Sequence, residues 1–152
     1  MLPMKARYAV KALVHLAVAQ PQGAVSIAAI AHSEAIPRKF LEAILLELRN
    51  HGILVSRRGK LGGYALRQSC DQIWLGDVLR KLSGPLAPVP CLSKTAYQRC
   101  AECPDERACA VRLLLADVHT ATLQILDNMS LADLVARLPT PLVATGAADD
   151  TA

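Results

Sequence analysis

Apolar residues recur at helical spacing through the first third of the chain, and proline and glycine interrupt the pattern. Residues 5–19 carry apolar side chains along one broad helical face, and the pattern ends at residues 20–23, which contain a proline and a glycine. Ser26 is suited to cap a helix and is followed by the short apolar run 27–31. The sequence therefore predicts a long helix and then a short one that stops near Ser33.

A third helix is predicted over 37–51. Pro37 is tolerated in its first turn, where a backbone N–H would have no partner, and Gly52 ends it. One stripe of this helix is expected to be buried and contains Phe40, Leu41, Ile44, Leu45 and Leu48. The other face begins with Arg38, Lys39 and Glu42.

After residue 52 the pattern becomes typical of strands. The runs 53–56 and 64–67 flank the segment 57–63, which is rich in glycine and positive charge. This arrangement predicts a β-hairpin with an exposed basic tip.

The second half of the chain is predicted to be helical around one irregular segment. A short amphipathic helix, 75–82, precedes a proline-broken segment, 84–108, and a long helix, 109–128, follows. Along the long helix a seam alternates in steps of four and three, at Val111, Leu115, Val118, Thr122 and Ile125. This heptad spacing suits a partner helix as well as the core of the chain itself. Ser130 is expected to cap a last short helix ending near Leu138.

Three helices followed by a basic hairpin are the parts of a winged helix-turn-helix. The predicted fold class is mainly α with a small β wing, a winged helix-turn-helix plus a long dimerisation helix. The predicted units are 1–83 for DNA binding, 84–108 as a cysteine-bearing sensor loop, 109–138 for dimerisation and 139–152 as a disordered tail.

The charge distribution favours a polyanionic partner. Residues 1–67 contain ten Lys and Arg against three Glu, whereas residues 68–152 contain seven Lys and Arg against ten Asp and Glu. Basic side chains at a helix start and at a glycine-rich tip suit a DNA groove and its phosphates, and Glu42 is suited to accept a hydrogen bond from cytosine. The candidate DNA-binding residues are Arg38, Lys39, Glu42, Arg57, Arg58 and Lys60. The alternative is that these charges only solvate an amphipathic helix and a surface turn.

Other classes of protein are disfavoured. The longest stretch without Asp, Glu, Lys or Arg, 12–33, is interrupted near its middle by proline and glycine, so no membrane span is expected. Lys11 and His15 fall inside the apolar part of a would-be signal peptide, which favours the cytoplasm over export. No nucleotide-binding loop, metalloprotease helix or Ser/His/Asp pattern occurs, so the chain is not expected to be an enzyme.

Four of the five cysteines lie within nineteen residues, at Cys91, Cys100, Cys103 and Cys109. Thiolates bind soft metals, and the two-residue gap between Cys100 and Cys103 lets both sulfurs approach one metal centre. An iron–sulfur cluster is favoured, with a thiol redox switch, zinc or no function as alternatives. A Cys91–Cys109 bridge would tie the loop across the start of the long helix. Cys70 is expected to be an inert small residue.

Several stretches resemble the Rrf2 family of bacterial winged-helix transcription regulators, which includes iron–sulfur-cluster regulators and nitric-oxide-sensing repressors. They are KARYAVKAL, IPRKFLEAILLELRNHGILVSRRGKLGGYAL, IWLGDVLRKLSG, CPDERACAVR and MSLADL, and the wing sequence RRGKLGGY is the most specific. The resemblance covers residues 1–138 and implies a homodimer on a partly palindromic DNA operator. It also implies a recognition helix over 37–51 with Lys39 and Glu42 at reading positions, and Arg58 in the minor groove.

The resemblance further implies a [2Fe–2S] or [4Fe–4S] cluster, because family members commonly hold one with three cysteines in this loop. Cys103 and Cys109 match the second and third of these ligands. The usual position of the first ligand holds Gln98, so Cys91, Cys100 or both would serve instead.

Two further ligand positions of the family are changed in this chain. Arg112 stands where the iron–sulfur regulators have a histidine, and Tyr8 stands near the position from which some relatives supply a carboxylate. An all-cysteine site is therefore expected, with His119 as a reserve ligand.

The sequence thus predicts an Rrf2-type regulator that senses iron–sulfur status, redox state or nitric oxide through a cysteine-ligated cluster. Because the loop leads into the dimerisation helix, chemistry at the cysteines is expected to change the spacing of two recognition helices. The alternatives are a thiol-switched regulator without a cluster and a protein-binding adaptor with the same fold. A steep loss of DNA affinity with salt would favour the DNA-binding alternatives over the adaptor.

Overall fold

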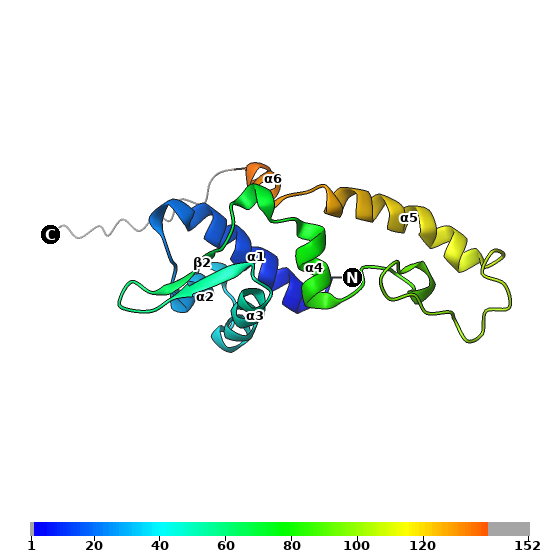
Figure 1. The fold of residues 1–152 in the computed structure, drawn as a ribbon, viewed down its shortest axis with the longest axis horizontal. Coiled ribbons are helices and arrows are strands. Elements are labelled where there is room, and N and C mark those ends of the chain that lie inside the picture. Colours follow the sequence, from blue (N-terminus) through cyan, green and yellow to red (C-terminus); the bar gives the residue numbers. More distant parts are fainter. Residues whose placement is uncertain (1, 140–152) are drawn as a thin grey trace.

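The computed structural model describes residues 2–139, and most of the predicted tail, 139–152, lies outside them. The helices are α1 (Met4–Ala19), α2 (Ile27–Glu34), α3 (Arg38–Asn50), α4 (Leu75–Ser83), α5 (Ala110–Asp127) and α6 (Leu131–Ala136). The strands β1 (Leu54–Arg57) and β2 (Gly63–Leu66) form one antiparallel hairpin, and short 3-10 turns occur at η1 (Gln20–Gln22), η2 (Cys70–Gln72) and η3 (Pro90–Leu92). The predicted fold class is confirmed: the described part is mainly helical with a small two-stranded wing (Figure 1).

Side-chain caps fix two of the helix starts. The Ser26 hydroxyl accepts a hydrogen bond from the backbone N–H of Ala29 over 3.1 Å, so α2 begins as predicted. At α6 the Ser130 hydroxyl accepts from the Asp133 N–H, while the Asp133 carboxylate accepts from the Ser130 N–H over 2.9 Å. Because Ser130 donates hydrogen bonds to the charged Asp133 carboxylate, the pKa of Asp133 lies below its usual value.

The core lies where α1 crosses the other helices of the body. Three alanines of α1, Ala6, Ala9 and Ala12, are fully buried and let neighbouring backbones approach closely. The larger side chains around them are also buried and come from several elements: Leu13, Ile30, Leu41, Leu45, Leu48, Leu54, Val78 and Leu131.

The prediction of a buried stripe on α3 is wrong at one residue. Phe40 is 65% exposed, whereas the other four members, which include Leu41 and Leu48, are buried. Successive residues of a helix turn by about 100°, so Phe40 lies roughly a quarter turn from the centre of the stripe that the other four define.

The wing is hydrogen-bonded to the segment that leads into α2. In the hairpin Leu54 is paired with Leu66 and Arg57 with Gly63. Val25 and Tyr64 exchange two backbone hydrogen bonds, of 2.9 and 2.8 Å between N and O. A Cβ at Gly63, whose φ is +151°, would overlap the carbonyl of Val25, so this close approach needs glycine.

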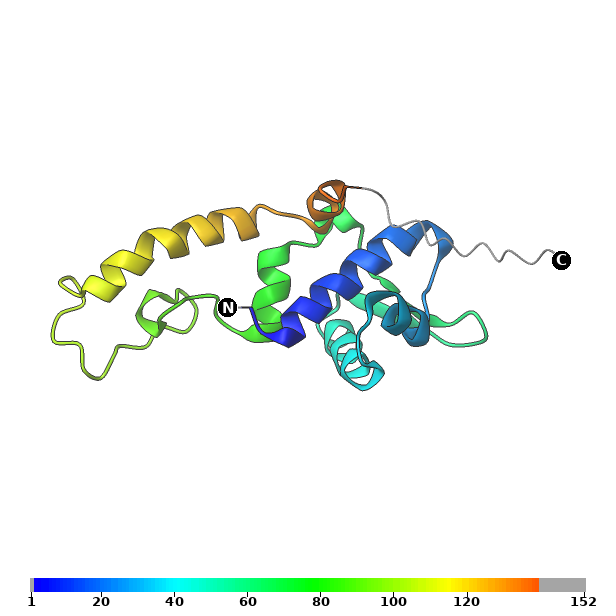
Figure 2. The ribbon, with the colours of Figure 1, turned by 180° about the vertical axis from the view of Figure 1, so that it is seen from behind.

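The helix α5 extends away from the compact body formed by α1 to α4, α6 and the wing (Figures 1 and 2). Its C-terminal end is attached to α4, where Arg80 forms ion pairs with Asp77 and Asp127. Its N-terminal end lies far from the wing, beside the irregular segment 84–109.

The last short helix joins the body rather than the long helix. The backbone segments on either side of α5 are tied together, because Leu75 N donates to Met129 O and Leu131 N donates to Ile73 O. The α6 helix packs against α1 and buries Leu131 in the core. The α6 helix, which belongs to the predicted dimerisation helices 109–138, thus packs on the body, and the unit boundaries remain predictions.

The exposed seam of α5 differs in register from the predicted one. Val111, Val118 and Ile125 are exposed as a partner-facing seam requires, but Leu115 and Thr122 are half-buried on the flank toward the body. Leu114, 72% exposed, lies on the exposed side instead. The exposed seam, Val111, Leu114, Val118 and Ile125, keeps heptad spacing, with steps of three, four and seven.

None of the helices within residues 2–139 combines the length and the apolar character that crossing a bilayer requires.

Gly76→Ala tests the junction of α4 and α5. In an open helix position this change is stabilising by about 0.5–1 kcal/mol. Here the added methyl would overlap the Asp127 carboxylate and come within 3.1 Å of the Leu126 carbonyl oxygen. We expect a loss of about 1–3 kcal/mol in the free energy of unfolding, measured by urea denaturation. A gain in stability would show that the two helices are not held in contact at this point.

Candidate nucleic-acid interface and cysteine pocket

The first turn of α3 presents polar side chains on a helix whose opposite face is buried. Arg38, Lys39 and Glu42 are all exposed, as predicted. The Arg38 Nε donates to Glu42 Oε1 over 3.1 Å, so the two charges are paired on the helix itself. Lys39 has no carboxylate within ion-pair distance among residues 2–139. The free positive charge of this turn is therefore carried by Lys39.

Phe40 adds an apolar ring to the same exposed turn, a contribution that sequence reasoning assigned to the core. An exposed apolar group beside charged ones is suited to contact the methyl group of thymine in the major groove. The signal that could have found it is its angular offset from Leu41 and Leu45, about 100° and 140° on the helix.

The wing tip carries three further exposed cations, Arg57, Arg58 and Lys60. No carboxylate in the described part of the chain lies within ion-pair distance of them. Leu61 at the same tip is 91% exposed. Unpaired cations on a protruding tip attract a polyanion such as the DNA backbone.

The four clustered cysteines line a single pocket of about 360 Å³ at the N-terminal end of α5. Its walls come from Val89 to Arg112, and Cys109 is the residue that precedes the first turn of α5. Partial desolvation of the Cys103 thiol, together with the neighbouring thiol of Cys109, raises the pKa of Cys103 above its usual value. All five cysteines are free thiols.

Side chains of the loop hold the walls of this pocket in place. An Arg99 guanidinium nitrogen donates to the carbonyl oxygens of Cys103 and Pro104, each over 3.1 Å. The Tyr97 hydroxyl is hydrogen-bonded to the Glu106 carboxylate, which raises the pKa of Tyr97. The irregular segment is thus an ordered loop with its own polar contacts.

The pocket brings four thiols, which are soft donors, around one cavity. Within residues 2–139, no three His, Cys, Asp or Glu side chains are close enough together to hold one metal ion. Four thiols around one pocket match the number of ligands of an iron–sulfur cluster. The ligands of a cluster bind different iron atoms, so they need not converge on one point. Arg112 also lines the pocket, and its Nε is buried without a hydrogen-bond partner in the described residues. A guanidinium N–H there is suited to a negatively charged sulfur centre.

Other candidate residues lie elsewhere. His119 does not line the cysteine pocket and instead faces a second pocket, so its reserve role as a ligand there is wrong. Gln98 is also absent from the lining, but its backbone N–H donates to Pro90 O. The Cys70 thiol donates to Gln20 Oε1 over 3.3 Å, and burial raises the pKa of Cys70, in keeping with an unreactive residue.

Comparison with known proteins gives one consistent family. Residues 2–137 match the family described as "Rrf2: Iron-dependent Transcriptional regulator". The rrf2-like protein of Rhodobacter capsulatus, described as an HTH-type transcriptional regulator, is 41% identical over 90% of this chain and 93% of its own length.

Two solved structures are similar over nearly the whole chain. CymR, the global cysteine regulator of B. subtilis, has a TM-score of 0.76 at 30% identity and covers 91% of this chain and 98% of its own. T. potens IscR has a TM-score of 0.70 at 25% identity and covers 92% and 93%. The two compared structures thus share the overall fold with this chain over more than nine-tenths of its length.

Proposed function

Because the chain belongs to the Rrf2 family of transcriptional regulators and is not an enzyme, we propose that it binds a DNA operator as a homodimer and senses metal or redox state through its cysteine pocket. The observation that carries the proposal is the set of unpaired cations on α3 and the wing, with four thiols at the far end of α5. Its place of action is the cytoplasm, where bacterial DNA lies.

DNA binding is supported by the way the core holds the two basic elements, α3 and the wing. The buried stripe of α3 keeps its polar first turn outward, and the backbone bridge between Val25 and Tyr64 holds the wing beside the same body. In this proposal α3 enters the major groove, where Lys39 contacts a base edge or a phosphate. Arg57, Arg58 and Lys60 contact phosphates or the minor groove. Glu42 accepts a hydrogen bond from cytosine once its ion pair with Arg38 is broken.

Single substitutions separate the two kinds of contact. Arg58→Ala should lower the slope of log affinity against log salt by about one, because one phosphate contact is lost. Lys39→Ala should cost about 1–3 kcal/mol of binding and relax the base preference at one position. The affinity is measured by fluorescence anisotropy at several salt concentrations, on a duplex that the protein itself selects from a random library.

Arg137→Ala, which removes an exposed cation after α6, is the matched control and should leave both quantities unchanged. Equal slopes for all the variants, or a flat salt dependence of the wild type, would contradict DNA binding and favour the adaptor alternative.

A homodimer is supported by the exposed seam of α5. Val111, Leu114, Val118 and Ile125 present exposed apolar side chains at heptad spacing along one side of α5. Such a stripe is suited to the same stripe of a second copy, because an isologous contact buries both at once. Two copies would also bring two α3 helices to one operator, which a specific site requires.

Val118→Glu should convert the dimer to a monomer, because it places a charge in the middle of the seam. Leu113→Glu is the matched control: Leu113 is 59% exposed against 58% for Val118, but it lies on another face of α5. Sedimentation equilibrium of the full chain at micromolar concentration distinguishes them. A monomeric wild type, or a dimeric Val118→Glu, would contradict this dimer.

The cysteine pocket is proposed to hold an iron–sulfur cluster through Cys91, Cys100, Cys103 and Cys109. When bound, such a cluster supplies reversible electron uptake at a potential set by the surrounding groups. The residues of this chain would bind it as thiolates, and Arg112 would donate a hydrogen bond to sulfur and offset negative charge. The lining includes Val111 and Arg112 of α5, so a change in the loop bears directly on the dimer helix.

Reconstitution without air tests the ligand set. The full chain treated with ferrous iron and sulfide should incorporate both and gain visible absorption, whereas Cys103→Ser should lose most of the iron and sulfide. Cys70→Ser is the control and should behave as the wild type, because Cys70 lies outside the pocket. No incorporation by the wild type would contradict the cluster.

One observation favours a thiol switch as the second candidate. The Cys109 thiol lies close enough to Cys103 to raise its pKa, and both line one pocket, so peroxide could join them as a disulfide in protein free of metal. Peptide mapping after oxidation distinguishes this pair from a Cys91–Cys109 bridge, which would tie the loop across the start of α5.

A further inference from the structure

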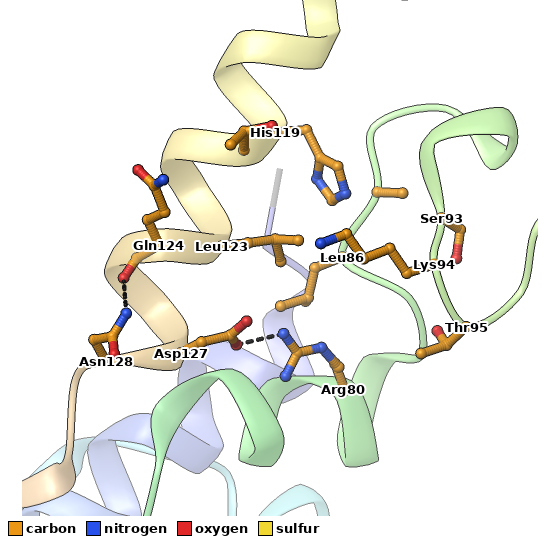
Figure 3. Close-up of a pocket in the computed structure, with 12 residues that line it drawn as sticks. Arg80, Leu86, Ser93, Lys94, Thr95, His119, Leu123, Gln124, Asp127 and Asn128 are labelled. Carbon is orange, nitrogen blue, oxygen red and sulfur yellow. Dashed lines mark hydrogen bonds and ion pairs between the residues drawn. The ribbon is translucent and has the colours of Figure 1, made fainter.

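A second pocket, of about 400 Å³, lies between α4, the segment 86–95 and α5 (Figure 3). It shares none of its lining residues with the cysteine pocket. Its size falls within the range of small-molecule sites. The residues that matter for its chemistry are Arg80, Leu86, Ser93, Lys94, His119 and Leu123.

His119 points into this pocket and has no partner there. The side chain is only 7% exposed, and neither ring nitrogen has a hydrogen-bond partner among the described residues. Figure 3 shows the imidazole projecting from α5 into the pocket. A neutral imidazole has one N–H donor and one acceptor, and buried polar groups in proteins are nearly always satisfied. The unsatisfied ring therefore points to a ligand with polar atoms.

The charges around the ring indicate the sign of that ligand. Arg80 is already paired with Asp77 and Asp127, and the pair with Asp127 closes one end of the pocket in Figure 3. Lys94 extends across the pocket toward α5, and within residues 2–139 no carboxylate lies within ion-pair distance of it. The cation that remains for a ligand is thus Lys94.

Neighbouring groups add one donor and an apolar wall. The Ser93 hydroxyl is buried and accepts a hydrogen bond from the Ala96 N–H over 2.9 Å, which leaves its own hydrogen to donate. Leu86 and Leu123 provide apolar surface in the same pocket. A negatively charged pair of oxygens, as in a carboxylate, attached to a short hydrocarbon chain matches this arrangement.

We propose that this pocket binds a small organic carboxylate. Its oxygens accept hydrogen bonds from Lys94, His119 and Ser93, and its hydrocarbon part packs on Leu86 and Leu123. Because the lining joins α4 of the body to α5, the carboxylate is an effector of DNA binding, a consequence that rests on the proposed function.

The test uses the full chain with ¹³C-labelled histidine and follows the His119 ring signal by NMR. Propionate and butyrate are the probes, propionamide is the uncharged counterpart, and sodium chloride matches ionic strength. We expect a saturable shift of the His119 signal with either carboxylate and none with propionamide or chloride. Lys94→Met should weaken binding by about tenfold or more, because a charged hydrogen bond is lost.

Lys81→Met makes the same change at an exposed lysine of α4 outside this pocket and should bind as the wild type. Lys94 is an exposed side chain, so its variant avoids the folding risk of replacing His119. No saturable shift with propionate, an equal response to propionamide, or unchanged binding by Lys94→Met would each overturn the proposal. The readout contains neither DNA nor metal, so its failure would leave the proposed operator binding intact, and loss of operator binding would leave the carboxylate site intact.

Discussion

The position of α5 depends on one junction with the body. At its C-terminal end Asp127 pairs with Arg80, and the absence of a side chain at Gly76 lets the α5 backbone approach α4. The strand-like exchange between the Ile73–Leu75 and Met129–Leu131 backbones clamps the chain on both sides of that contact. This junction orients α5, along which the apolar seam runs, and the segment 86–95 packs beside α5 on the way to the cysteine pocket at its other end.

Much of the fold could be predicted from the sequence, because its signals are local. Ser26, Gly52 and Ser130 mark helix ends through their own side chains or backbone freedom, and the structure has those ends within a residue or two. The errors concern which way a helix faces. Phe40 and Leu115 fit an apolar pattern equally well in either register, and only the packing against α1 and α4 decides which side is covered.

In the candidate site, too, the features that depend on local sequence could be predicted, whereas those that depend on packing between distant residues could not. The exposure of Arg38, Lys39, Glu42, Arg57, Arg58 and Lys60 follows from the buried stripe opposite and from the glycine-rich tip, so the sequence was sufficient to predict it. That all four clustered cysteines line one pocket follows from their short separation along the chain. The pocket around His119 was not foreseen, because Arg80, Lys94 and His119 are far apart in sequence and meet only when α5 folds back along the loop.

The backbone bridge between Val25 and Tyr64 has a mechanical consequence. It ties the wing to the segment that leads into α2, and α2 packs against α3, so the wing and α3 are held together in one block. In the proposed dimer, a change at α5 would then move two such blocks relative to each other without deforming either one. A regulator built in this way would discriminate among operators by the length of DNA that separates the half-sites, about one helical turn or a multiple of it. A change of that separation by a single base pair would suffice to exchange one set of targets for another.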